Sequence, residues 1–120
     1  MPHITFECTD NVEIDFQAFF AELTDQLVAT EYAPKLGIKC RVVRSEEYYI
    51  IDGTTDYKMV NLLIRLREGR PSEILEKFST ISMELLEKYL AKDITDKKII
   101  LSTEIKELIK GLDLTKNSIR

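Results

Sequence analysis

The alternation of apolar and polar residues predicts a strand at the start of the chain and a helix directly after it. In HITFEC, Ile4, Phe6 and Cys8 fall on one side of an extended backbone and the residues between them fall on the other. From Val12 to Thr30, apolar residues recur at helical spacing along one stripe. A helix with one apolar side must bury that side, so we expect it to lie against a sheet.

The middle of the chain predicts two strands joined by a tight turn. The run IKCRVVRSEEYYII (residues 38–51) is rich in β-branched and aromatic residues and predicts a long or bent strand. The run YKMVNLLIRLR (residues 57–67) predicts the returning strand. Asp52-Gly53 stands between them, and Asp-Gly between two such runs is a strong signal for a β-hairpin.

A second helix and a final strand complete the pattern. Pro71 to Lys92 carries another one-sided apolar stripe, and Pro71 suits the first turn of a helix. The run KKIILSTEIKELI (residues 97–109) predicts the last strand, and GLDLTKNSIR (residues 111–120) predicts a tail. The element order is therefore strand-helix-strand, hairpin, strand-helix-strand, which is an internal repeat.

This repeat predicts an α/β (α+β) fold. Each half, at about residues 1–55 and 56–110, should contain two parallel strands joined by a helical crossover. Together the halves would form a four-stranded mixed sheet with two helices on one face. The other face would carry Leu63, Cys40, Phe6 or their neighbours, depending on register. Exposed apolar sheet of that size usually indicates subunit association, so we expect a ring-like homo-oligomer.

Composition narrows the classes of partner. With 120 residues and 44% hydrophobic composition, the chain is expected to form a single domain (residues 1–120) with its own core. Its 21 acidic and 17 basic residues give a formal net charge of -4, which argues against nucleic acid as the main partner. A small anionic substrate, by contrast, needs only a few well-placed cations.

Location and metal binding are also constrained by the sequence. No apolar run approaches the roughly 18–20 residues that span a bilayer, so no membrane partner is expected. The first residues lack the basic and apolar regions of a signal peptide, and we expect a cytoplasmic protein. Cys8 and Cys40 lie far apart in the chain and suit a reducing compartment. His3 is the single histidine, so a histidine-based metal centre or a Ser-His-Asp triad is not expected.

Pro2 is the first candidate for chemistry. Proline cannot donate a ladder hydrogen bond, so it is poorly explained as an ordinary strand residue. Initiator methionine is normally removed before proline, and its removal would leave a secondary amine at position 2. An α-amino group has a reference pKa of about 7.7–8.0, and apolar surroundings or nearby cations would lower that pKa. Such an amine is suited to act as a general base at neutral pH.

Three cations are candidates for binding an anion. Arg70 lies between Gly69 and Pro71, where a guanidinium and a helix N-terminus together would suit a carboxylate. Lys39 and Arg41 share one face of their predicted strand, about 6.6 Å apart along it. Each of the three could equally be an exposed side chain at a loop or strand edge. The sequence shows neither a glycine-rich phosphate loop nor metal-ligand spacing, and it predicts no cofactor and no metal.

Five stretches resemble one known family, and they extend over essentially the full chain: MPHITFECTDN, GIKCRV, DGTTDYKMVNLLIRLREGR, LSTEIKEL and TKNSIR. They are similar to 5-carboxymethyl-2-hydroxymuconate isomerase, a family of the tautomerase superfamily. The MPH start, the DG-x-x-DY block and the Gly-Arg before the second helix are the most specific parts. The resemblance implies a tautomerase-like fold with two βαβ units per subunit, assembled as a homotrimer.

The resemblance also implies a reaction and the residues for it. The catalytic base of the family is its amino-terminal proline, which corresponds to Pro2, and its carboxylate-binding arginine corresponds to Arg70. Lys39 stands where arginine is usual in the family, and lysine keeps the charge without the bidentate fork. Arg41 matches a second family arginine and is expected to bind substrate. The implied reaction is a cofactor-independent 1,3-/1,5-keto-enol tautomerisation of a dicarboxylate or tricarboxylate dienol, similar to the ring-cleavage products of aromatic catabolism.

Two alternatives stay open on the sequence. The chain could keep the fold as a non-catalytic trimeric interaction module, since the superfamily includes a cytokine-like branch. It could also use the proline base for hydration or decarboxylation of an unsaturated acid, and Lys39 keeps that alternative open. Retention of Met1 would make the Pro2 nitrogen an amide and exclude proline-base chemistry.

Overall fold

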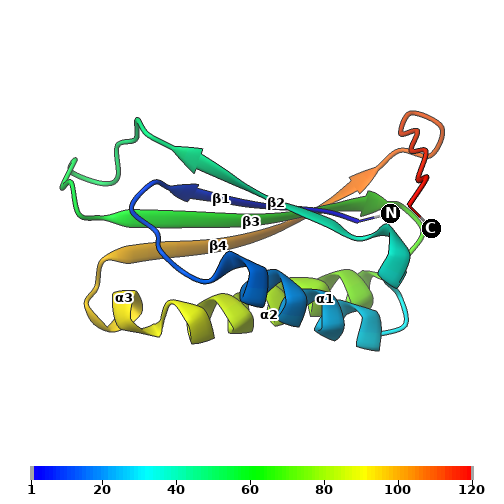
Figure 1. The fold of residues 1–120 in the computed structure, drawn as a ribbon, viewed down its shortest axis with the longest axis horizontal. Helices are drawn as coiled ribbons and strands as arrows, with labels where there is room; N and C mark the ends of the chain where they lie inside the picture. Colours follow the sequence, from blue (N-terminus) through cyan, green and yellow to red (C-terminus); the bar gives the residue numbers. More distant parts are fainter. Residues whose placement is uncertain (1, 120) are drawn as a thin grey trace.

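A computed structural model describes residues 2–119 and places four strands in one sheet, with the helices packed against one side of it (Figure 1). The predicted removal of Met1 concerns a residue outside this range. The strands are β1 (His3–Thr9), β2 (Lys39–Ser45), β3 (Lys58–Arg67) and β4 (Ile99–Leu108). The helices are α1 (Phe16–Ala29), α2 (Ser72–Tyr89) and the short α3 (Ala91–Thr95), with a 3-10 turn η1 (Lys35–Gly37) before β2.

The strand order is β2-β1-β3-β4. β1 pairs in parallel with β2, β3 pairs in parallel with β4, and β1 joins the two pairs by running antiparallel to β3. Both long helices cover the same face of the sheet (Figure 1). This confirms the predicted α/β (α+β) fold, in which two βαβ units share one mixed four-stranded sheet.

The predicted hairpin at Asp52-Gly53 is wrong. β2 ends at Ser45, and β1 lies between β2 and β3, so the strands on either side of the turn do not pair. The turn itself exists within a loop of residues 46–57. The Gly53 N–H donates to the Ile50 carbonyl at 2.9 Å, and Gly53 has a φ of 83°. In each half, the helix connects two strands that pair in parallel: β1 with β2, and β3 with β4. The two halves meet where β1 pairs with β3 at the centre of the sheet.

Both long helices are shorter than the apolar pattern predicts. α1 begins at Phe16 because the Asp15 carboxylate caps it, accepting a hydrogen bond from the Ala18 N–H at 3.0 Å. α2 ends at Tyr89 because Leu90 leaves helical geometry, with φ -117° and ψ 24°. The apolar periodicity of the sequence continues beyond the start of α1 and the end of α2, but the backbone leaves helical geometry at both points.

The core lies between the sheet and the helices. The predicted alternation in β1 is confirmed, since Ile4, Phe6 and Cys8 are all fully buried. Phe6 makes edge-to-face contacts with Phe16 and Phe19, with ring centroids 5.1 and 5.3 Å apart. The other buried core residues come from α1, β3 and α2 and from the segments that connect the elements: Val12, Leu23, Leu27, Ala33, Val60, Leu62, Ile64, Leu66, Phe78, Leu85, Leu86 and Leu90.

The sheet face turned away from the helices is called the open face here. Leu63 lies on it and is half-buried, as one predicted register required. Phe6 and Cys40 instead belong to the helix side, because Phe6 is buried in the core and Cys40 packs against it. The open face is therefore more polar than expected. Among the described residues, no helix has the length and apolarity needed to cross a membrane.

Candidate active site

The candidate residues gather at one end of the sheet. β1 and β2 start together because they are parallel, and β3 ends beside them because it is antiparallel to β1. The Lys39 N–H donates to the Pro2 carbonyl at 3.2 Å, which ties the start of β2 to the residue before β1. Arg70 follows directly after β3. This end lies on the right in Figure 1.

Pro2 is buried and immediately precedes a central strand. By the alternation of β1, it falls on the same side as Ile4 and Phe6, which are fully buried. The backbone bond to Lys39 fixes its position against the neighbouring strand. An amine at such a place would have few waters around it, and burial disfavours the charged form of an amine.

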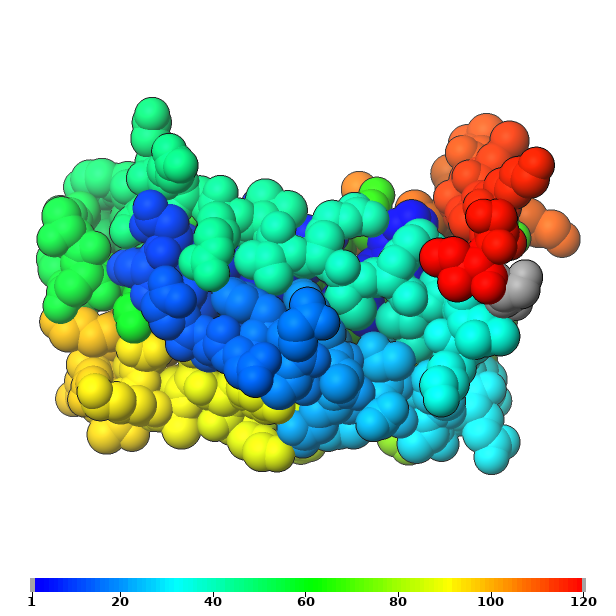
Figure 2. Space-filling view, viewed as in Figure 1, coloured from blue at the N-terminus to red at the C-terminus, as the bar shows by residue number. Residues whose placement is uncertain are grey.

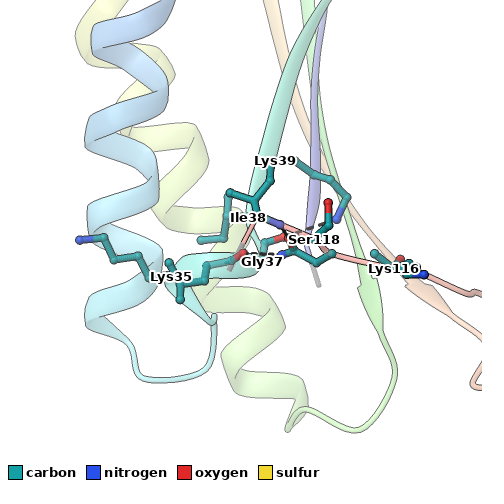
Figure 3. Close-up of a pocket in the computed structure, with 10 residues that line it drawn as sticks. Lys35, Gly37, Ile38, Lys39, Lys116 and Ser118 are labelled. Carbon is teal, nitrogen blue, oxygen red and sulfur yellow. Dashed lines mark hydrogen bonds between the residues drawn. The ribbon is translucent and has the colours of Figure 1, made fainter.

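Lys39 lines a pocket of about 420 Å³ between the start of β2 and the C-terminal tail (residues 109–119). Its ammonium group donates to the Gly37 carbonyl at 3.4 Å. Figure 3 shows Lys39 extending toward the tail, whereas Lys35 points away from it. The described residues that line the pocket are Lys35, Leu36, Gly37, Ile38, Lys39, Thr115, Lys116, Asn117, Ser118 and Ile119.

The tail forms one wall of this pocket because it folds back along the end of the sheet. The Asn117 side-chain amide donates to the Leu36 carbonyl at 2.8 Å, and the Arg67 Nε donates to the Asp113 carboxylate at 3.3 Å. The sequence predicts a tail over residues 111–120, and its TKNSIR stretch contributes to the family resemblance without indicating where the tail lies. No periodicity marks residues 109–119, so the sequence offered no pattern that would place them beside β2.

The surroundings of Lys39 lower the pKa of its ammonium group. Burial lowers the pKa of its ammonium group, Asp113 acts in the opposite direction, and Arg41 and Arg65 lower the pKa further. An ammonium group that neighbouring cations repel is stabilised when an anion binds beside it. Lys39 is therefore suited to bind a carboxylate that enters the pocket.

Arg70 is held by backbone carbonyls rather than by an acidic side chain. Its Nε donates to the Tyr32 carbonyl at 2.7 Å, and its Nη1 donates to the Arg67 carbonyl at 3.0 Å. The guanidinium is half-buried, and burial lowers its pKa. Nη2 takes part in neither bond. Arg70 thus ties the segment after α1 to the end of β3, with one nitrogen left for another acceptor.

Arg41 lies on the open face, two residues beyond Lys39. Its Nη2 is 3.5 Å from the His3 Nδ1, and its side chain is exposed. The structure therefore brings Lys39 and Arg41 onto one surface. Arg70 follows the end of β3, and Pro2 stands at the start of β1. Pro2, Arg41 and Arg70 do not belong to the described lining of the pocket around Lys39.

The whole chain matches one family. The sequence model of the 5-carboxymethyl-2-hydroxymuconate isomerase family matches residues 2–120. The 5-carboxymethyl-2-hydroxymuconate Delta-isomerase of Escherichia coli is 31% identical over 121 residues, covering 99% of this chain and 96% of that protein. The matched range includes all four candidate residues: Pro2, Lys39, Arg41 and Arg70.

Solved structures show the same fold. A 5-carboxymethyl-2-hydroxymuconate isomerase from Deinococcus radiodurans R1 superposes with a TM-score of 0.91 at 28% identity, covering 98% of this chain and 90% of that one. A fused 4-OT that forms a symmetric trimer superposes with a TM-score of 0.71 at 17% identity, covering 95% of this chain and 93% of that one. The second likeness shows the tautomerase-like fold alone. From the full-length family match and the E. coli relative together, the chain belongs to the 5-carboxymethyl-2-hydroxymuconate isomerase family, a family of isomerases within the tautomerase superfamily.

Proposed function

We propose that the protein converts a dicarboxylate or tricarboxylate dienol, such as 5-carboxymethyl-2-hydroxymuconate, into its oxo-enoate by keto-enol tautomerisation. The observation that carries the proposal is the position of Pro2. It is buried, it precedes a central strand, and its carbonyl is bonded to the peptide of Lys39. Once its nitrogen is free, Pro2 is a secondary amine held at the end of the sheet where the candidate cations gather.

The proposed reaction needs one group that takes a proton and returns it. The Pro2 amine accepts the proton of the enol hydroxyl, the electrons of the conjugated chain shift, and the same amine delivers a proton to carbon further along that chain. Burial beside Ile4 favours the neutral amine at neutral pH. The steps balance without an oxidant, a reductant or a cofactor.

The cations hold the carboxylates of the substrate and stabilise the developing enolate charge. Lys39 faces the pocket, Arg70 offers the nitrogen that its backbone bonds leave free, and Arg41 extends the positive surface beyond Lys39. Fixed cations in a partly dry site stabilise a developing anion more than they would in water. The roles of these three residues are part of the proposal.

The proposal includes a homotrimer in the cytoplasm. Large apolar side chains are exposed at opposite ends of the molecule, with Tyr49 at 76% in the 46–57 loop and Leu114 at 89% in the tail. A contact between different surfaces of successive copies closes into a ring when its rotation allows. The symmetric trimer formed by the fused 4-OT relative supports three subunits.

The decisive test is the conversion of 5-carboxymethyl-2-hydroxymuconate followed by ultraviolet absorbance, with intact mass confirming that Met1 has been removed. Pro2→Ala keeps an amine but loses the secondary ring nitrogen, and we expect kcat to fall by about 100-fold or more. An added residue that prevents processing turns the Pro2 nitrogen into an amide, and we expect no activity above background. Pro34→Ala is the control for loss of a proline elsewhere and should leave kcat unchanged.

Arg70→Ala tests the carboxylate site, with an expected fall in kcat/KM of about 100-fold. Arg44 is a matched control because it also donates to two backbone carbonyls, those of Asp10 and Val12, at 3.3 and 3.1 Å. Arg44→Ala should lower stability without that loss of kcat/KM. Full activity of a Met1-retaining protein would overturn the proline mechanism. Disappearance of the dienol without the oxo-enoate would indicate hydration or decarboxylation instead.

A further inference from the structure

Arg67, the last residue of β3, contacts both sides of the candidate site. Its backbone carbonyl accepts the hydrogen bond from the Arg70 Nη1 at 3.0 Å. Its guanidinium holds one residue of the tail with two bonds, because Nε donates to the Asp113 carboxylate at 3.3 Å and Nη2 donates to the Asp113 carbonyl at 3.1 Å. A single residue therefore connects the proposed carboxylate-binding arginine with the wall of the pocket around Lys39.

The tail has no apolar anchor on the rest of the chain. Between residues 109 and 119, every large apolar side chain is exposed, with Leu112 at 80% and Ile119 at 96%. Asp113 and Asn117 are the half-buried residues of this segment, and the side chain of each is bonded to the body of the molecule. Figure 2 shows the tail, in orange to red, projecting above the rest of this end. A segment with so few buried contacts has low local stability, so its position depends on its polar contacts.

The contact between Arg67 and Asp113 is the strongest of these attachments. It combines a charge-assisted bond with a second bond from the same planar fork, and the Asp113 side chain is only 18% exposed. The Asn117 side chain makes one neutral bond, to a backbone carbonyl at 2.8 Å. The Lys110 N–H donates to the Glu68 carboxylate at 3.2 Å, but this bond is exposed. Loss of the Arg67 contact should therefore release the part of the tail that lines the pocket.

We propose that Arg67 and Asp113 are positioning residues of the proposed isomerase site. Together they hold the tail against the end of the sheet, so that the pocket keeps its wall and Lys39 stays in partly dry surroundings. A substrate carboxylate binds Lys39 more tightly in such a pocket than in open water. This inference rests on the proposed function. It adds that the Arg67 side chain acts on substrate binding through the tail, without touching the reacting atoms.

The first measurement is steady-state turnover of 5-carboxymethyl-2-hydroxymuconate by Arg67→Ala and Asp113→Ala. Both changes should raise KM, Arg67→Ala by about tenfold, while kcat stays close to that of the wild type because the Pro2 amine is not moved. Asp113→Ala should have the smaller effect, since its backbone carbonyl can still accept the bond from Nη2. The two substitutions remove opposite charges near Lys39, so direct charge effects would move KM in opposite directions. A rise in both variants therefore indicates release of the tail.

The variant that carries both substitutions tests whether the two residues act as one contact. Its KM should match that of Arg67→Ala alone, because the tail is already released in the single variant. Arg67→Lys keeps the charge but loses the fork, and it should recover part of the affinity. Lys88→Ala is the matched control, because it breaks the ion pair with Glu22 at 2.8 Å between α1 and α2, and it should leave KM unchanged. Independent effects of Arg67→Ala and Asp113→Ala that multiply in the double variant would contradict a single contact.

His3 reports the position of the tail without any turnover. It is the only histidine in the sequence, so it gives a single set of ring signals in an NMR spectrum. Burial lowers its pKa, and so do three neighbouring cations, while Asp113 opposes them: the cations are Lys39, Arg65 and Arg41. In Arg67→Ala, the Asp113 carboxylate moves away with the tail, so the pKa of His3 should fall. Loss of the Arg67 charge alone would raise that pKa instead.

The proposal is overturned if Arg67→Ala and Asp113→Ala leave KM at the wild-type value, or if the pKa of His3 does not fall in Arg67→Ala. Dissociation of the oligomer in Arg67→Ala, measured by size-exclusion chromatography, would also overturn it, because the substitution would then act through assembly. A wild type that converts no dienol would refute the proposed function instead. The His3 titration would still decide whether Arg67 holds the tail, because it needs no substrate.

Discussion

The two βαβ halves share one architecture and differ in chemistry. In both, a strand is joined by a long helix to a parallel partner, and both helices cover the same face. On the open face, the first half pairs His3 with Lys39, whereas the second half pairs Met59 with Ile100. At the matching open-face positions of the two strand ends, the first half therefore carries two basic residues and the second half carries two apolar ones. Symmetry of backbone does not imply symmetry of function.

The cores of the two halves differ as well. α1 contributes Phe19, which meets Phe6 and Tyr89 edge to face with ring centroids 5.3 and 5.2 Å apart. α2 contributes Phe78, which is equally buried but forms none of the aromatic pairs identified among the described residues. The first half is therefore built around interlocking rings, and we expect it to be the less tolerant half.

The largest expected effect is on stability. Phe78→Ala should lower the free energy of unfolding by about 3–5 kcal/mol, because it leaves a large cavity. Phe19→Ala should lower it by about 1–2 kcal/mol more, because edge-to-face contacts are lost as well. Urea unfolding followed by circular dichroism measures both. Phe20→Ala, at a half-buried position of α1, is the control and should have a smaller effect. A larger loss for Phe78→Ala than for Phe19→Ala would reverse the comparison.

The next effect separates the chemistry of the two strand ends. Lys39→Ala should lower kcat/KM for the dienol by about 100-fold, because a cation facing the pocket is lost. Ile100→Ala changes the matching open-face position of β4, which is 46% exposed, and should leave kcat/KM close to that of the wild type. Lys39→Arg keeps the positive charge, adds a bidentate fork and should keep the activity that Lys39→Ala loses. Equal losses for Lys39→Ala and Ile100→Ala would show that the end with the cations has no special role.

The family and the repeat could be predicted because their signals are local. Alternation marked β1, helical periodicity marked α1 and α2, and their order indicated two βαβ units. Which strands lie side by side is not a local property. Asp52-Gly53 marked a real turn, but its flanking segments are separated by β1, and no pattern near the turn could reveal that.

The same distinction applies to the site. Lys39 and Arg41 could be placed on one face because they are two residues apart in one strand. Arg65 and Lys106 could not be added to them, because their position depends on the registers of β1 with β3 and of β3 with β4. A run of cations across a sheet is invisible until the partners of each strand are known.

The smallest effect tests whether the cations around His3, which come from both halves, act on it together, through the pH dependence of stability. Burial and the charges of Lys39, Arg65 and Arg41 lower the pKa of His3, and Asp113 opposes them. The folded state therefore binds a proton less readily than the unfolded state, whose histidine titrates near about 6.5. Stability contributed by neutral His3 is present at higher pH and is lost as pH falls below that value toward the folded pKa.

Urea unfolding between about pH 8 and pH 5, in a buffer without multivalent anions, measures this dependence. The wild type should lose stability relative to His3→Gln as the pH falls, by less than either comparison above. Arg65→Gln removes one of the repelling cations and should reduce the difference. If His3→Gln follows the wild type at every pH, neither burial nor the charges of Lys39, Arg65 and Arg41 lower the pKa of His3 enough to affect stability, and these cations then act as separate side chains.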